Sequence, residues 1–396
     1  MPDIQAVNGV AEASVQAVNG VAEASIETIN GVTLNSGPAT ASRWVAATEN
    51  GYLAHAANSD LTSWTAYDAY AEGDNASNQS QGDSESVAYG KNSSGAGIFV
   101  ATRATQAQGS QIRELTVSGT DVTSSGTWTN IDLAGENSKS VIMEVQWGPH
   151  SNGDTAGVWI AVGKQGDGDI YRSTDGAANW SAIDLSGLSG HLSGNVNQDW
   201  INGVANDGNG KWMFAQDNRI YYSTDDGASW SVSTPFSSNS PGYAQNIVYT
   251  NNSWVFIYSR SSQVRFRSCA ASDITDWGNE VDSSNMTHTT TDNRGVKAAA
   301  ANGNVCVVTE SSAVINRFTV SGKTIGTVSS VTISNSGAVR HIATDGTKWV
   351  AVCNDGDAHE STDNGANWTQ RLDGFQADGN NALDFEGVAA DVYLPL

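Results

Sequence analysis

A set of charged and amide side chains lies at or close to the points where short apolar runs begin. Carboxylates, a guanidinium, an imidazole and amides can hold the hydroxyl groups of a sugar or the backbone of a peptide through hydrogen bonds. The members of this set are Glu85, Glu144, Asn202, Lys297, Arg340, His341 and Glu386, with Gln245 and Asn246 beside them. If the fold brings these run starts together, we expect either a binding site for a polar ligand or a solvated rim.

Patterns for other chemistry are missing from the sequence. The six histidines do not have the spacing of a metal site, and neither a Gly-x-Ser-x-Gly turn nor a phosphate-binding Gly-Lys-Ser/Thr loop occurs. Asp175, Asp225 and Asp363 recur in similar surroundings, but one carboxylate per turn supplies too few oxygen ligands for calcium, which is the weaker alternative. We expect no catalytic residue, no metal and no cofactor.

The elements that must position these residues are short apolar segments, most of them rich in aromatic and β-branched residues, which favour strands. Most follow a Gly- and Asn-rich turn of the kind that closes tight hairpins, and another apolar run usually precedes the turn. The seven copies are 44–47, 98–101, 158–162, 212–215, 254–258, 305–308 and 349–352. This repetition predicts an all-β chain of antiparallel hairpins.

A second signature follows several of these segments. Residues 223–230 and 361–368 match the pattern Ser-x-Asp-x-Gly-x-x-Trp in full, and residues 173–180 match it with the glycine one position early. The tryptophans recur at intervals of roughly 50 residues, except near 319–329, where one repeat has lost the pattern. The recurring residues are Ser173, Asp175, Trp180, Ser223, Asp225, Gly227, Trp230, Ser361, Asp363, Gly365 and Trp368.

This pattern resembles the Asp-box of sialidase-like repeat proteins. The resemblance implies a β-propeller of four-stranded antiparallel blades, with the box in the hairpin between the two outer strands of a blade, and the seven copies of the apolar segment predict a seven-bladed ring. The box residues then have a structural role, and the polar run starts gather at the mouth of a central channel. The segment 385–391 supplies the inner strand that is missing before Trp44, so we expect the C-terminal strand to close the ring. Residues 29–34 could supply that strand instead.

Residues 1–37 differ from the rest, which divides the chain into an extended N-terminal arm and a propeller over 38–396. The arm repeats an 11-residue unit with apolar residues three apart and then a turn-prone Asn-Gly. A unit of this kind cannot bury its own apolar residues, so we expect assembly through Ile4, Val7, Val15, Val18, Ile26 and Ile29. A flexible tether is the alternative. The units resemble N-terminal segments of marine bacteriophage virion proteins.

The charge balance restricts the partners. The chain carries 42 acidic side chains against 19 lysines and arginines, for a net charge of −23. Such a surface repels nucleic-acid phosphates and anionic membranes, and no apolar run is long enough to insert in a bilayer. Cys269, Cys306 and Cys353 fit no disulfide framework, and the last two lie in apolar runs. Because no signal-peptide h-region follows Met1, we expect assembly in a bacterial cytoplasm.

Together these features predict a non-enzymatic phage virion protein, a tail-fibre, receptor-binding or decoration component. Its arm would bind other virion proteins and support a homo-oligomer, and its propeller would meet a host-surface glycan or protein. Two alternatives are kept. A secreted sialidase-like glycosidase or lectin would need three clustered arginines and a Tyr-Glu pair, whereas Arg43, Arg294 and Arg340 are scattered. An assembly factor resembling the photosystem two propellers would need a basic arginine patch.

Overall fold

The computed structural model describes six two-residue strands before residue 41 and most of the chain from residue 41 onward. The ranges are 41–48, 52–68, 84–107, 110–118, 128–133, 141–164, 170–189, 201, 203–216, 218–233, 235, 243–261, 263–287, 298–309, 312–333, 337–376 and 383–394. Within these ranges every regular element is a β-strand, which confirms the all-β prediction.

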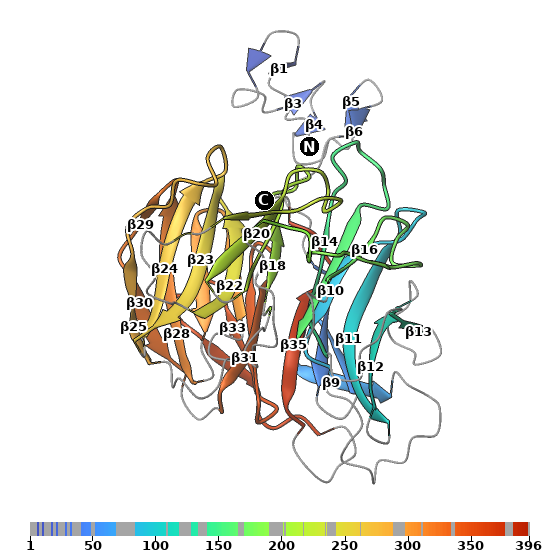
Figure 1. The fold of residues 1–396 in the computed structure, drawn as a ribbon. Coiled ribbons are helices and arrows are strands. Elements are labelled where there is room, and N and C mark those ends of the chain that lie inside the picture. Colours follow the sequence, from blue (N-terminus) through green and yellow to red (C-terminus); the bar gives the residue numbers. More distant parts are fainter. Residues whose placement is uncertain are drawn as a thin grey trace.

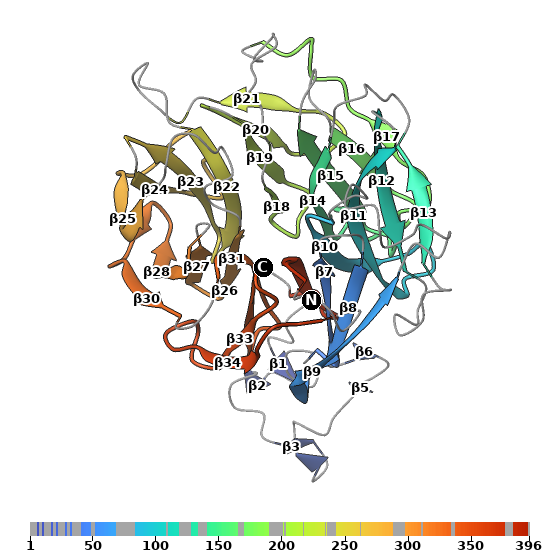
Figure 2. The same ribbon diagram turned by 90° about the horizontal axis from the view of Figure 1, so that it is seen from below.

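Six four-stranded antiparallel sheets stand around a common axis (Figures 1 and 2). Five of them use consecutive strands: β10 (Val87–Lys91), β11 (Gly97–Ala107), β12 (Ser110–Val117) and β13 (Thr129–Asp132); β14 (Val141–Gly148), β15 (Val158–Lys164), β16 (Ile170–Ser173) and β17 (Ser181–Ala182); β18 (Val204–Asn206), β19 (Trp212–Gln216), β20 (Arg219–Ser223) and β21 (Ser231–Ser233); β22 (Tyr243–Thr250), β23 (Ser253–Arg260), β24 (Gln263–Ala270) and β25 (Val281–Thr287); β31 (Val339–Thr344), β32 (Trp349–Cys353), β33 (Ala358–Ser361) and β34 (Thr369–Leu372).

The sixth four-stranded sheet joins the two ends of the propeller. Its order is β35 (Phe385–Ala390), β7 (Arg43–Thr48), β8 (Tyr52–Ala57) and β9 (Asp60–Asp68). The pairing runs from Phe385 opposite Thr48 to Ala390 opposite Trp44. The C-terminal strand therefore closes the ring, as predicted, and residues 29–34 do not.

One place in the ring is taken by an irregular sheet of five strands. It contains β26 (Ala298–Asn302), β27 (Val305–Thr309), β28 (Val314–Ser321), β29 (Thr324–Ile325) and β30 (Ser329–Thr332). The first half of β28 pairs with β30 and its last two residues pair with β29, so the outer strand is interrupted. The structure thus shows six four-stranded blades, and the prediction of seven such blades is wrong. The interruption falls where the sequence has lost its Ser-x-Asp-x-Gly-x-x-Trp turn.

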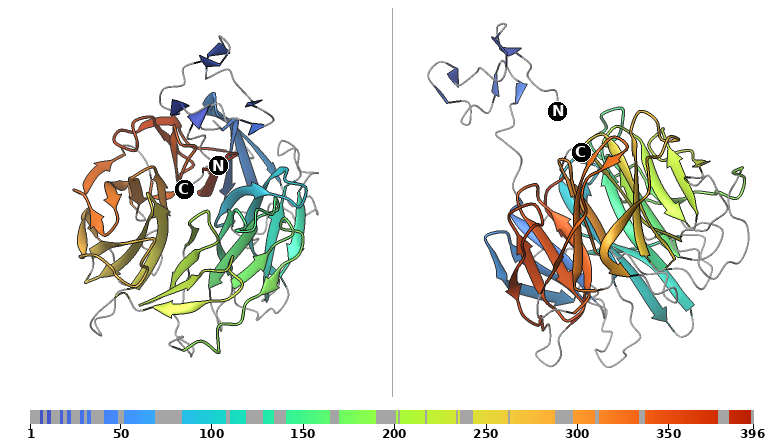
Figure 3. Two further views of the ribbon diagram at one scale, coloured as in Figure 1. Left: turned by 90° about the horizontal axis from the view of Figure 1, so that it is seen from above. Right: turned by 90° about the vertical axis from the view of Figure 1, so that its left-hand side faces the viewer.

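The first strand of each of these sheets is the one nearest the axis (Figure 3). These inner strands follow one another in the order β35, β10, β14, β18, β22, β26, β31 and back to β35. Between neighbouring sheets lie apolar clusters, anchored by tryptophans of the second strands, each of which removes a large apolar area from water. Five are fully buried: Trp44, Trp159, Trp212, Trp254 and Trp349. All three cysteines are buried free thiols, which confirms the core position expected for two of them.

The three Ser-x-Asp hairpins connect the third and fourth strands of their sheets and share one hydrogen-bond pattern. In the hairpin after β20, the Ser223 hydroxyl donates to Asp225 at 2.8 Å and accepts the Gly227 N–H at 2.9 Å. The Trp230 indole N–H donates to the Gly227 carbonyl at 3.0 Å. Equivalent bonds form in the hairpins that contain Asp175 and Asp363. These bonds stabilise the turn, because Ser and Asp side chains can bind nearby backbone groups.

The same hairpins link each sheet to the one before it. In two of them the turn residue preceding the glycine, Asp226 or Asn364, has a positive φ. Its carbonyl accepts a hydrogen bond of 2.7 Å from an arginine of the previous sheet, Arg172 or Arg317. The glycine that follows lies against an apolar side chain of that sheet, so the turn closes the gap between blades. In the hairpin with the early glycine, Ala177 takes the left-handed backbone at φ 67°.

In the arm, six two-residue strands form three small antiparallel hairpins. They are β1 (Ala6–Val7) with β2 (Val10–Ala11), β3 (Ala17–Val18) with β4 (Val21–Ala22), and β5 (Thr28–Ile29) with β6 (Val32–Thr33). In the sequence an Asn-Gly pair stands between the two strands of each hairpin. Val7, Val18 and Ile29 belong to these strands, whereas Ile4, Val15 and Ile26 lie outside the described residues.

Asp391 ties the two chain ends together immediately beyond β35. Its carboxylate accepts hydrogen bonds from the backbone N–H groups of Ser42 and Arg43 at 2.7 and 3.0 Å, and also from the Ser42 hydroxyl. We expect Asp391→Ala to lower the free energy of unfolding by about 1–3 kcal/mol, because these bonds to a charged acceptor are lost. Chemical denaturation measures the change. The exposed Asp373→Ala is the control and should change stability by less than about 0.5 kcal/mol; equal losses would contradict the role of Asp391.

Gly365 tests the contact between a hairpin and the preceding sheet. Its φ is +77°, and a Cβ would lie 2.7 Å from Val307 Cγ2. Gly322 also has a positive φ, +57°, but a Cβ there would have no atom within 4 Å. Both Gly→Ala substitutions strain the backbone, and Gly365→Ala should cost about 1–3 kcal/mol more because it also overpacks. Thermal and denaturant unfolding of the two variants give the difference, and similar losses would show that the inter-sheet contact is unimportant.

Candidate functional site

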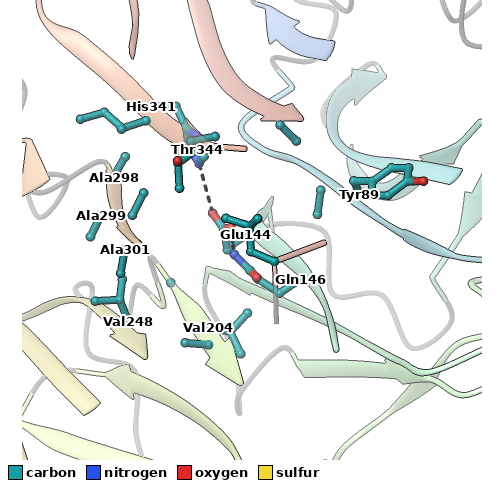
Figure 4. A pocket seen from close by; sticks show the side chains of 18 of the residues that line it. Tyr89, Glu144, Gln146, Val204, Val248, Ala298, Ala299, Ala301, His341 and Thr344 are labelled. Atoms are coloured by element: carbon teal, nitrogen blue, oxygen red, sulfur yellow. Dashed lines mark hydrogen bonds and ion pairs between the residues drawn. The ribbon is translucent and has the colours of Figure 1, made fainter. Parts of the chain in front are cut away.

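The inner strands surround a cavity of about 210 Å³ on the axis of the ring. Every inner strand contributes to its lining, as expected for a central channel. Small apolar side chains form much of the wall, including the run Ala298–Ala301 on β26. Polar side chains interrupt this wall, among them Asn246 and the Glu144, Gln146 and His341 side chains seen in Figure 4.

One end of the cavity is shaped by β-bulges near the starts of four inner strands. The register shifts in β14, β22, β31 and β35, which leaves one extra residue in each. Three of the four extra residues are polar: Gln245, Arg340 and Glu386. A bulge turns a side chain away from the regular alternation of a strand. We call this bulged end of the channel, where the inner strands begin, the mouth; Gln245, Arg340 and Glu386 lie at it.

A carboxyl–imidazole pair spans the cavity near the mouth. Glu144 on β14 and His341 on β31 approach to 4.0 Å between Oε2 and Nε2 (Figure 4). These strands lie on opposite sides of the ring, with β35 and β10 between them on the shorter path. Beside them, Arg340 and Glu386 form an ion pair of 3.4 Å between neighbouring strands. The charges of Arg340 and Glu386 thus compensate each other.

Glu144 is a buried carboxyl group. Burial raises its pKa to about 8, while the hydrogen bond from the Gln146 amide and the Ser86 hydroxyl act in the opposite direction. At neutral pH most of these side chains are protonated, so the group both donates and accepts hydrogen bonds. This state suits an uncharged polar ligand better than a cation.

The other end of the cavity is covered by the residues that follow β35. The Tyr393 ring meets the Trp147 ring edge-on, with 4.7 Å between centroids, and the Tyr393 hydroxyl donates to Asn206 Oδ1 at 3.2 Å. Leu394 lies at the turn between β31 and β32, where a Cβ on Gly346 would be 3.0 Å from its Cδ2. The C-terminal segment therefore crosses from one side of the ring to the other. We call this cavity the well, and the residues after β35 cover one end of it.

The structure brings together much of the residue set singled out in the sequence. Glu144 meets His341, and Arg340 meets Glu386. Glu85 lies two residues before the start of β10 and is half-buried. Asn202 and Lys297 lie outside the described residues.

Three polar residues of the well were missed by the sequence analysis. Gln146 lies two positions after Glu144 on the same strand, so the alternation of side chains could have indicated it. Asn206 ends β18, in an Asn-Asp-Gly sequence that indicated only a turn. Nothing in the sequence around Tyr393 indicated that it would fold back under the ring.

The structure also gathers three arginines around a tyrosine and a glutamate, a set that sequence reasoning did not find. Tyr258 donates a hydrogen bond to Glu280, which also contacts Arg265 and, at 3.5 Å, Arg260. Arg267 donates to a backbone carbonyl at 2.8 Å. The Tyr258 side chain is fully buried, so the cluster holds the outer part of one sheet rather than presenting a nucleophile.

The hairpin aspartates lie on the face opposite the mouth, because the turn from third to fourth strand points that way in an antiparallel sheet. Burial acts to raise the pKa of Asp225, but hydrogen bonds from Ser229 and Ser223 bring it below its ordinary value. The pKa values of Asp175 and Asp363 are lowered in the same way. Among the residues the structure describes, no group of three metal-ligating side chains is found. No helix there is able to cross a membrane.

No protein-family model matches the chain, and no curated protein matches it. Among solved structures, the family 74 xyloglucanase from Xanthomonas campestris is similar with 14% identity and a TM-score of 0.57, over 84% of this chain and 53% of that one. The chain thus spans about half the length of the xyloglucanase. YCF48 from Cyanidioschyzon merolae is similar with 18% identity and a TM-score of 0.46, over 72% of this chain and 85% of that one. YCF48 bound to D1 peptide is similar with 15% identity and a TM-score of 0.45, over 73% of this chain and 82% of that one. The fold and the xyloglucanase likeness define a β-propeller.

The raised pKa of Glu144 makes stability depend on pH. Between about pH 4.5 and 8 the unfolded chain has released this proton while the folded chain retains it, so native stability falls as pH rises. Glu144→Gln removes the titration. We expect the free energy of unfolding of the variant, relative to that of the native protein, to rise by up to about 1.4 kcal/mol per pH unit within that window. Above the window the difference should stay constant. Denaturant unfolding at several pH values measures this, and a pH-independent difference would show that Glu144 ionises normally.

Proposed function

We propose that this chain is a non-enzymatic structural protein of a phage virion, acting as a tail-fibre, receptor-binding or decoration component. Residues 1–37 would anchor it to other virion proteins and help to form a homo-oligomer. The propeller would be exposed outside the particle and bind a host-surface glycan or protein. Assembly would take place in the bacterial cytoplasm, with which three buried free thiols agree.

One observation carries this proposal: the arm joins the propeller on the face away from the mouth. β35 begins at its bulge near the mouth and ends where Asp391 binds Ser42 and Arg43. The chain therefore enters β7 at the far end of the channel. A particle attached through residues 1–37 would leave the polar mouth directed outward, which is the arrangement that attachment to a host surface needs.

We further propose that the five-stranded sheet serves as a seventh, irregular blade and that the Ser-x-Asp hairpins are Asp boxes. The order of the inner strands supports the first point, since β26 occupies a regular place between β22 and β31. The shared hydrogen bonds of the three hairpins support the second.

A lectin without a role in a virion is the second candidate, and the polar well favours it. A glycosidase requires two carboxyl groups on either side of the scissile bond. Glu144 instead contacts an amide and an imidazole, and Glu386 is paired with Arg340. This arrangement supports binding over hydrolysis.

The proposal predicts that the arm drives assembly. The full chain should be an oligomer by multi-angle light scattering, and the chain shortened to begin at Pro38 should be a folded monomer, because β7 and β35 close the ring without the arm. Circular dichroism and thermal unfolding confirm that the shortened chain is folded. If both forms are monomers, the proposal of self-assembly through residues 1–37 is wrong and the lectin hypothesis is favoured.

A further inference from the structure

Residues 391–394, which follow β35, contact three sheets besides their own. Tyr393 contacts Trp147 on β14 and Asn206 on β18, and Leu394 lies at the turn between β31 and β32. In the order of the inner strands, β14 and β18 lie on one side of β35 and β31 lies on the other. We call residues 391–394 the strap, because they connect sheets across the axis of the ring.

The tryptophan that receives the strap is held in place by its own surroundings. The Trp147 indole N–H donates to the Ala156 carbonyl at 2.8 Å, which fixes the orientation of the ring. Two glycines make room for this ring, since a Cβ on Gly90 or on Gly157 would collide with the Trp147 side chain. The Tyr393 ring, at 4.7 Å between centroids, therefore packs edge-on against a surface that has little freedom to move.

The hydroxyl group of Tyr393 meets a second fixed partner. Asn206 is almost fully buried, and its amide donates to the Trp147 carbonyl at 3.0 Å, so this side chain bridges β18 to β14. Its Oδ1 accepts the Gly208 N–H at 3.1 Å and the Tyr393 hydroxyl at 3.2 Å. Burial raises the pKa of Tyr393, and the charge of Asp207 acts in the same direction, so the hydroxyl stays protonated and continues to donate.

The strap holds β35 at the end where it pairs with the start of β7. Among the described strands, β7 is the one that pairs with β35, through a single ladder that ends with Ala390 opposite Trp44. A strand held by one ladder opens most readily from an end. Opening from this end requires Asp391 to leave its partners on β7 and Tyr393 to leave Trp147. The strap therefore acts on the pairing that closes the ring.

We propose that the strap is a lock on the ring, which blocks the local opening in which β35 separates from β7. Its two anchors lie on opposite sides of β35, Tyr393 toward β14 and β18 and Leu394 toward β31. A displacement of the segment toward either side therefore works against one of the two anchors. This role is independent of the virion assignment, because it concerns only the stability of the closed ring.

Hydrogen–deuterium exchange of the full chain, read by mass spectrometry, measures this opening. In Tyr393→Ala, amide exchange in β35 and β7 should become roughly tenfold faster, because the ring contact and its buried area are lost. Exchange in β22–β24, which lie outside the described contacts of the strap, should keep its native rate. Leu394→Ala removes the second anchor and should speed exchange in β35 and β7 by roughly fivefold; if Tyr393→Ala does not fold, this variant decides alone. Unchanged exchange in these two strands in either folded variant, or an equal increase in all sheets, overturns the proposal.

Two further variants separate the lock from a general loss of stability. Tyr393→Phe keeps the ring on Trp147 and loses only the hydrogen bond to Asn206, so exchange in β35 should rise by about threefold or less. Tyr222 is half-buried like Tyr393, but it packs against the apolar cluster between the sheets β18–β21 and β22–β25. Tyr222→Ala should therefore speed exchange in those two sheets and leave β35 at its native rate. An increase in β35 as large as that in Tyr393→Ala would show ordinary destabilisation and overturn the proposal.

Discussion

The antiparallel pairing of β35 with β7 is the constraint on which the rest of the structure depends. Neighbouring sheets bury their apolar faces against each other, and this burial is complete only when the ring is closed. The pairing from Phe385 to Ala390, together with the bonds of Asp391, joins the last sheet to the first. The central well exists only because this closure sets the inner strands at a fixed distance from the axis.

The fold could be predicted from the sequence to a large extent because its signals are local and repeated. An aromatic strand preceded by an Asn-Gly or Asp-Gly turn predicts the same hairpin in each repeat. The closing strand could be recognised because a similar apolar run occurs near the C-terminus. The irregular sheet was harder. Loss of the hairpin pattern near 319–329 was recognised, but the replacement by two short strands depends on a tight turn at Gly322 and on pairing partners that a pattern does not specify.

The site was predictable only in part, for a physical reason. That Glu144 and His341 lie near the starts of inner strands follows from register, but their contact across the ring depends on bulges that shift each strand by one residue. The base of the well depends on Tyr393, whose position is set by packing on Trp147, far away in the sequence. The cluster around Glu280 was missed for the same reason, since its arginines come from two adjacent strands of one hairpin and meet their acid only in three dimensions.

The shared sheet has a mechanical consequence. β7 is an interior strand, hydrogen-bonded to β35 on one side and to β8 on the other. Tension applied through the arm acts along the axis of β7, so both rows of hydrogen bonds are loaded together in shear, whereas an edge strand pulled from its end would peel one bond at a time. The chain thus transmits a pulling force to the propeller at the point where its sheet resists separation best.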